Sequence, residues 1–108
     1  MRIATFNVQR LRLRLRDDTA QFDGACDDDI PETSTVETPG LDRKDRELTA
    51  SVIRHLDADV IALQEVFNQQ TLDHFHDEFL TDGNVDPWPH RLCMQGNDGR
   101  GFNVALMS

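Results

Sequence analysis

The chain has 108 residues, with 20 acidic and 11 basic side chains and a formal net charge of −9. This length suits one domain or a part of a larger one. No apolar run approaches the roughly 18 residues that cross a bilayer, which excludes an integral membrane protein. No secretory signal is visible, which favours the cytoplasm. The acidic balance argues against a generic nucleic-acid coat protein but allows an enzyme with a locally positive site.

The N-terminal residues predict a strand followed by a charged segment. Residues 2–8 are rich in β-branched and aromatic side chains, which indicates a strand. From Arg10 to Arg16, arginine and leucine alternate strictly, which in a strand places all the guanidinium groups on one face. Two interpretations stay open. The arginines attract a phosphodiester backbone, or they protect an exposed edge strand from aggregation.

Residues 17–41 predict a flexible acidic loop. They hold two prolines, several Thr and Ser residues and the acidic run 27–29, without hydrophobic periodicity. The acidic run lacks the spacing of a calcium-binding EF-hand loop, so we expect a solvated segment.

The middle of the chain predicts a helix and then a buried strand. Residues 41–56 have an apolar helical stripe, and Asp42 is the expected N-cap. The stripe contains Leu41, Leu48, Val52, Ile53 and Leu56. Residues 60–63 are continuously apolar, which is typical of a strand buried on both faces.

The C-terminal part predicts a second helix and two strands. Residues 70–80 form a helix capped by Asn68, with an apolar stripe of Leu72, Phe75 and Phe79. Short strands follow at 91–94 and 102–107, separated by a glycine-rich turn. The order β-α-β-α-β-β indicates an α/β or α+β fold.

The histidines and cysteines show no metal-binding or nucleophilic pattern. We expect all four histidines to lie on the surface: His55, His74, His76 and His90. His74 is four residues before Glu78, a spacing that allows an ion pair on a helix. Of the two cysteines, Cys26 lies in the acidic loop without a basic neighbour, and Cys93 is expected to be a small core residue.

Two polar residues at strand ends carry the chemical signal. Asn7 ends the first predicted strand, and Glu65 ends the apolar strand of the middle segment. Ligands commonly bind beyond the carboxyl ends of strands, and oxygen ligands suit Mg²⁺. The alternative is structural: Glu65 caps the following helix and Asn7 starts a turn.

Three blocks of this sequence resemble the endonuclease/exonuclease/phosphatase superfamily. Residues 1–8, Met-Arg-Ile-Ala-Thr-Phe-Asn-Val, are similar to its opening strand. Residues 59–66, Asp-Val-Ile-Ala-Leu-Gln-Glu-Val, are similar to its metal-binding strand, and residues 97–108 to its next block. The resemblance implies a deoxyribonuclease-I-like fold, in which two β-sheets form a sandwich with outer helices.

The resemblance also implies an activity and a site. Glu65 corresponds to the carboxylate that binds the catalytic Mg²⁺ (or Mn²⁺), and Asn7 lies beside the same metal. Arg100 is a candidate contact to the substrate phosphate. The expected enzyme hydrolyses phosphate esters, with nucleic acid or another phosphodiester or phosphomonoester as its substrate. Nuclease action is favoured, and lipid or small-molecule phosphatase action is the alternative within the family.

The sequence also departs from the family pattern. It contains no Gly-Asp-Phe-Asn and no terminal Ser-Asp-His motif, so the family's histidine and aspartate base is absent from these residues. We therefore expect residues 1–108 to form the N-terminal part of the fold and to be inactive alone. The alternative to an enzyme is an inactive fragment or a non-enzymatic interaction module.

Overall fold

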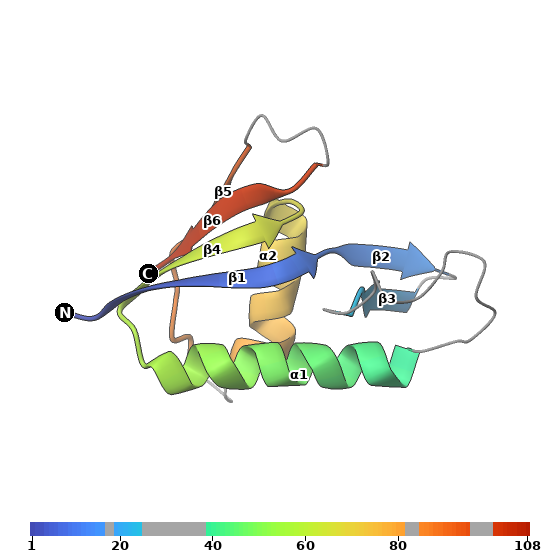
Figure 1. The fold of residues 1–108 in the computed structure, drawn as a ribbon, viewed down its shortest axis with the longest axis horizontal. Coiled ribbons are helices and arrows are strands. Elements are labelled where there is room, and N and C mark those ends of the chain that lie inside the picture. The colour runs from blue at the N-terminus through green and yellow to red at the C-terminus, as the bar shows by residue number, and fades with distance from the viewer. Residues whose placement is uncertain (17–18, 25–38, 82–84, 96–100) are drawn as a thin grey trace.

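The computed structural model describes residues 1–16, 19–24, 39–81, 85–95 and 101–108. Its elements are β1 (Ile3–Leu11), β2 (Leu13–Arg16), β3 (Thr19–Phe22), α1 (Pro39–Leu56), β4 (Val60–Val66), α2 (Gln69–Phe75), the π-helical turn η2 (His76–Leu80), β5 (Arg91–Met94) and β6 (Asn103–Met107). Four strands form a mixed sheet in the order β1-β4-β6-β5, and β2 pairs with β3 in an antiparallel hairpin (Figure 1). The mixed α/β class expected from the sequence is confirmed.

The parallel pair β1 and β4 determines where the strand ends meet. Ile3 lies opposite Val60, and Asn7 lies opposite Gln64. A parallel pair needs a crossover connection, and α1 lies within it. Because both strands run in the same direction, their carboxyl ends reach the same edge of the sheet. Glu65 directly follows Gln64, so Asn7 and Glu65 are near neighbours in this pair of strands. The expectation that Asn7 ends its strand is wrong, because β1 continues for four more residues to Leu11.

The hydrophobic core lies between one face of the sheet and the two helices. In β1, Val8 is buried and its neighbours Asn7 and Gln9 are exposed, as expected for a strand covered on one face. Figure 1 shows α1 running along the sheet and α2 crossing behind it. Phe75 of α2 is fully buried, and its ring centroid is 5.9 Å from that of Phe22. Within the described residues, neither helix is long and apolar enough to span a bilayer.

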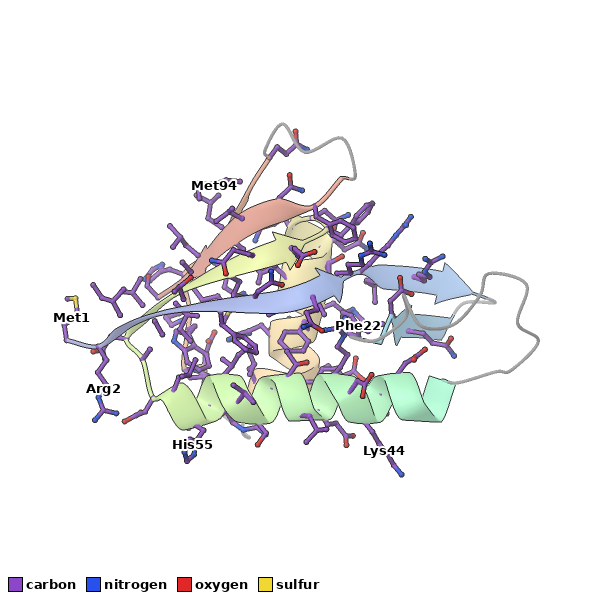
Figure 2. All side chains as sticks on the ribbon, viewed as in Figure 1. Met1, Arg2, Phe22, Lys44, His55 and Met94 are labelled. Carbon is purple, nitrogen blue, oxygen red and sulfur yellow. The ribbon has the colours of Figure 1, made fainter. Side chains whose placement is uncertain are left out.

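The other face of the sheet is apolar and uncovered by any described element. Its exposed hydrophobic side chains are Ile3, Leu92, Met94, Val104 and Leu106. Ile3 has 73% of its surface exposed, and Figure 2 shows Met94 pointing away from both helices. The expectation that residues 60–63 are buried on both faces is therefore wrong for the described residues. Ile61 and Leu63 face the core, whereas Val60 and Ala62 are half-buried.

The predicted first helix is present, but its buried face differs from the expected stripe. It begins at Pro39, so Asp42 lies in the first turn and is not the N-cap. Leu48 and Val52 are 66% and 43% exposed, while Arg46 and Ile53 are fully buried. The buried face of α1 therefore lies at a different angle around the helix axis from the expected stripe. Arg46, and not Leu48, faces β1.

The second helix was predicted closely except at one residue. Asn68 caps α2 as expected, since its Oδ1 accepts the Thr71 amide at 2.7 Å. His74 Nε2 lies 3.3 Å from Glu78 Oε2, which confirms the predicted pair. The expectation that His76 is solvated is wrong, because it is fully buried between two aspartates. It begins a π-helical turn, whose wider winding changes which positions face the core.

The segment predicted as a continuous loop contains a strand. Residues 19–22 form β3, where Phe22 pairs with Leu13 and packs on the aromatic rings of α2 and η2. A short strand with one large aromatic anchor gives little periodicity, which explains why the sequence did not predict it. Residues 25–38, which include Cys26 and the acidic run 27–29, lie outside the described residues.

Cys93 is half-buried against the core, and burial raises the pKa of its thiol. The folded state therefore holds the thiol proton more tightly than the unfolded state does. As a result, the free energy of unfolding is highest below the thiol's ordinary pKa and falls as the pH rises through the raised pKa. We expect iodoacetamide to alkylate Cys93 several-fold more slowly than free cysteine at pH 8. The rate is measured by mass spectrometry in a Cys26→Ser protein, where Cys93 is the only thiol. Alkylation at the rate of free cysteine would contradict the burial of this thiol.

Candidate functional site

A β-bulge interrupts the pairing of the second half of β1 with the carboxyl end of β4. After Asn7 pairs with Gln64, the next aligned pair is Leu11 with Val66, so residues 8–10 face the single residue Glu65. The pairing of β4 with β6 also shifts between Leu63 and Val66. The backbone conformation is left-handed at Gln9 (φ 53°), Arg10 (φ 51°) and Glu65 (φ 65°). Such conformations cost about 1–2 kcal/mol for residues other than glycine and concentrate at functional sites.

The bulge determines the position of the Glu65 side chain. Strict alternation from the buried Leu63 would expose Gln64, bury Glu65 and expose Val66. Instead Val66 is fully buried, while Gln64 and Glu65 are both half-buried. A bulge redirects side chains in this way. The carboxylate of Glu65 therefore reaches the edge of the sheet instead of the core.

Glu65 has an unmatched negative charge in the described part of the chain. No described residue forms a hydrogen bond or ion pair with its carboxylate. It does not cap α2, because Asn68 does so. Among the described residues no fully buried side-chain oxygen lacks a partner, so the unpartnered Glu65 oxygens reach solvent and are accessible to a hydrated cation.

Asn7 lies beside Glu65 and helps to form the bulge. Its side chain is exposed, and its Oδ1 accepts the Gln9 amide at 2.8 Å. This hydrogen bond spans only two residues, and Asn7 remains within β1, so the alternative that Asn7 starts a turn stays a prediction. A carbonyl oxygen has two lone pairs, so the same atom retains one for a ligand.

Arg46 of α1 fixes the bulge from beneath, a feature that the sequence analysis missed. The residue is fully buried. Its Nη1 donates to the carbonyl of Val8 at 2.6 Å and its Nη2 to the carbonyl of Gln9 at 2.7 Å. Its Nε donates to the carbonyl of Asp23 in the segment after β3. One guanidinium group thus satisfies backbone acceptors that the irregular strand leaves unpaired.

The arginine segment 10–16 is not one continuous strand. β1 ends at Leu11 and β2 begins at Leu13, so the alternation breaks at Arg12. Arg14 Nε lies 2.6 Å from Asp23 Oδ1 and is partly neutralised. The guanidinium carbon of Arg12 instead lies 4.4 Å from the ring centroid of Phe67, just beyond the end of β4.

Two histidines lie at the opposite end of β4 from Glu65. His55 is near the end of α1, which leads into the start of β4, and Figure 2 shows its side chain on the side of α1 that faces away from the sheet. His90 pairs its backbone with Ser108, which follows the β6 residue opposite Ile61. His74 and His76 are engaged with carboxylates on or near α2 and η2. The described histidines are thus engaged or located elsewhere.

The donor set at the bulge suits one metal type. No three His, Cys, Asp or Glu side chains cluster in the part of the chain that the structure describes, which argues against a zinc-type site there. Mg²⁺ commonly takes one or two carboxylates and keeps several waters. The oxygens of Glu65 and Asn7 fit this requirement. Arg100, the candidate phosphate contact, lies outside the described residues.

Comparison with known families decides the assignment. The model of the endonuclease/exonuclease/phosphatase family matches residues 4–108. The chain belongs to this family. Its members are Mg²⁺-dependent phosphoesterases with a deoxyribonuclease-I-like fold, which confirms the resemblance seen in the sequence. No curated protein and no solved structure matches the chain.

Proposed function

We propose that this chain carries the metal-binding part of a Mg²⁺-dependent phosphodiesterase of the endonuclease/exonuclease/phosphatase family. The observation that carries the proposal is the half-buried Glu65 carboxylate, which has no described partner and lies in a strained bulge beside Asn7. Glu65 has an unfavourable backbone conformation, and its side chain makes no described contact that would compensate for it. Such backbone conformations cluster at binding and catalytic sites.

The chemistry follows from the two side chains. Glu65 supplies the negative charge that holds the cation, and Asn7 supplies a neutral oxygen. Bound Mg²⁺ would polarise a phosphoryl oxygen and stabilise the leaving oxygen of a phosphate ester. Arg46 acts as a positioning residue, because it holds the backbone of the bulge in which both ligands lie.

The proposal assigns no general base within these residues. His74 and His76 are paired with carboxylates, and His55 and His90 lie at the other end of β4. We therefore expect the 108-residue chain alone to bind the metal without hydrolysing phosphodiesters.

A non-enzymatic interaction module is the second candidate, favoured by the uncovered apolar face of the sheet.

Localised metal binding tests the proposal. The chain has 20 acidic residues, so total Mn²⁺ uptake would not identify the site. We expect submillimolar Mn²⁺ to broaden the amide NMR signals of residues 7–10 and 64–66 before all others. Glu65→Gln keeps the size of the side chain but removes its charge, and it should raise the Mn²⁺ concentration needed more than tenfold.

Glu47→Gln is the matched control, because Glu47 is an exposed glutamate that pairs with Arg43 on α1. It should leave the broadening at the bulge unchanged. Equal broadening in wild-type and Glu65→Gln proteins would contradict the metal site. An assay of a labelled oligonucleotide with Mg²⁺ tests the chain as an enzyme, and Glu65-dependent cleavage would show that our expectation of inactivity is wrong.

A further inference from the structure

We infer that Arg12, Phe67 and Phe102 form a stacking subsite for an unpaired nucleobase of a single-stranded nucleic acid, next to Glu65. The inference rests on the proposed function and names the substrate class for the same edge of the sheet. It starts from a cluster of two aromatic rings and one guanidinium group that the metal chemistry does not use.

The cluster lies where β1, β4 and β6 meet. Phe67 directly follows β4, two residues after Glu65, and its amide donates to the carbonyl of Leu11 at 3.0 Å. The side-chain amide of Asn103 at the start of β6 donates to the Phe67 carbonyl at 2.8 Å. The backbone of Phe67 is therefore held from both neighbouring strands, two residues beyond Glu65.

The three side chains form an aromatic and cationic surface. The guanidinium carbon of Arg12 lies 4.4 Å from the centroid of the Phe67 ring. The Phe102 ring meets Phe67 edge to face, with centroids 6.2 Å apart and planes at 71°. All three side chains are half-buried, so each keeps some exposed surface. Gly101 (φ +80°) lies against the Phe67 ring edge, where an added Cβ would be 3.5 Å from Cε2.

The charge of Arg12 is not neutralised within the described residues. Its guanidinium group has no ion pair and no hydrogen bond there. Arg43 makes a similar contact, with its guanidinium carbon 5.1 Å from the Phe79 centroid, but it also pairs with Glu47 and Glu78. Of these two arginine–phenylalanine pairs, the one beside Glu65 keeps its charge available for a phosphate group.

This chemistry favours a single-stranded nucleic acid. Bases stack on aromatic rings and on guanidinium planes once they are unpaired, and every base offers such a face. A free guanidinium group adds a contact to the adjacent phosphate. A long duplex is less suited, because its bases are already paired and stacked and offer no free face to the aromatic rings.

A pair of oligonucleotides separates stacking from charge. Binding of a fluorescein-labelled oligothymidylate decamer is compared with binding of an abasic decamer of equal phosphate number, by fluorescence anisotropy in EDTA. We expect wild-type protein to prefer the decamer with bases about tenfold. Phe67→Leu should abolish the preference. Arg12→Lys should keep the affinity for the abasic decamer and reduce the preference.

Arg43→Ala is the matched control, since it removes the paired arginine of the other contact and should leave the preference intact. Thermal unfolding shows whether each variant is folded, and Arg12→Lys provides a test should Phe67→Leu unfold. Equal affinity of wild-type protein for the two decamers would overturn the inference and indicate a phosphate contact alone. Because the assay contains no metal, Glu65→Gln should retain the preference, so failure of the metal site and failure of this subsite are distinguishable.

Discussion

Replacing Arg46 with methionine is expected to lower the free energy of unfolding by about 3–5 kcal/mol. Removing one partner from a buried network of charged hydrogen bonds has this order of cost. The substitution keeps most of the side-chain length but removes the donors to the carbonyls of Val8 and Gln9. These acceptors belong to a strand segment with left-handed residues, which a regular ladder would not satisfy. Urea unfolding followed by circular dichroism measures the loss.

Arg43→Met is the matched control on the same helix. The Arg43 side chain is 57% exposed and pairs with Glu47 and Glu78, so its loss should cost only about 0–1 kcal/mol. The bulge should also lose its shape in Arg46→Met, which would shift the amide NMR signals of residues 8–10. A loss no larger than that of the control would show that Arg46 does not support this segment.

Replacing Glu65 with glycine is expected to raise stability while removing the metal site. Glu65 has φ 65°, a conformation that glycine adopts without steric cost. We expect the free energy of unfolding to rise by about 1 kcal/mol, from the relieved backbone strain. The selective Mn²⁺ broadening at residues 7–10 should disappear, because the charged ligand is gone.

Glu65→Gln separates these two effects. It keeps a side chain at the same φ, so it should lose the metal response without gaining stability. Urea midpoints for the three proteins and their Mn²⁺ titrations provide the comparison. A glycine variant less stable than wild type would contradict the assignment of strain to this position.

The sequence predicted the helices and strands whose formation depends on residues close to one another along the chain. The apolar run at residues 60–63, the Asn68 cap and the stripe of Leu72 and Phe75 each specify structure within one element. Asn7 and Glu65 could be placed at neighbouring strand ends, because parallel strands bring their carboxyl ends together. The sequence therefore predicted that these two residues lie near each other in the sheet, whereas metal binding by them stays a prediction.

Long-range contacts account for what the sequence did not reveal. Arg46 is buried only because a bulge presents carbonyl groups to it, and no residue type marks that bulge in β1. His76 is buried because a π-helical turn and Asp86, ten residues later, enclose it. The pairing of Phe67 with Arg12 joins segments that are far apart in the chain.

The uncovered apolar face has a consequence for handling the protein. Its side chains, with Ile3 73% and Leu92 54% exposed, offer a surface on which two molecules could stack. The net charge of −9 opposes such contact at long range. Added salt shortens the Debye length to about 10 Å at 0.1 M and weakens this repulsion. Colloidal stability should therefore be greatest in dilute buffer, where anionic repulsion reaches furthest between molecules.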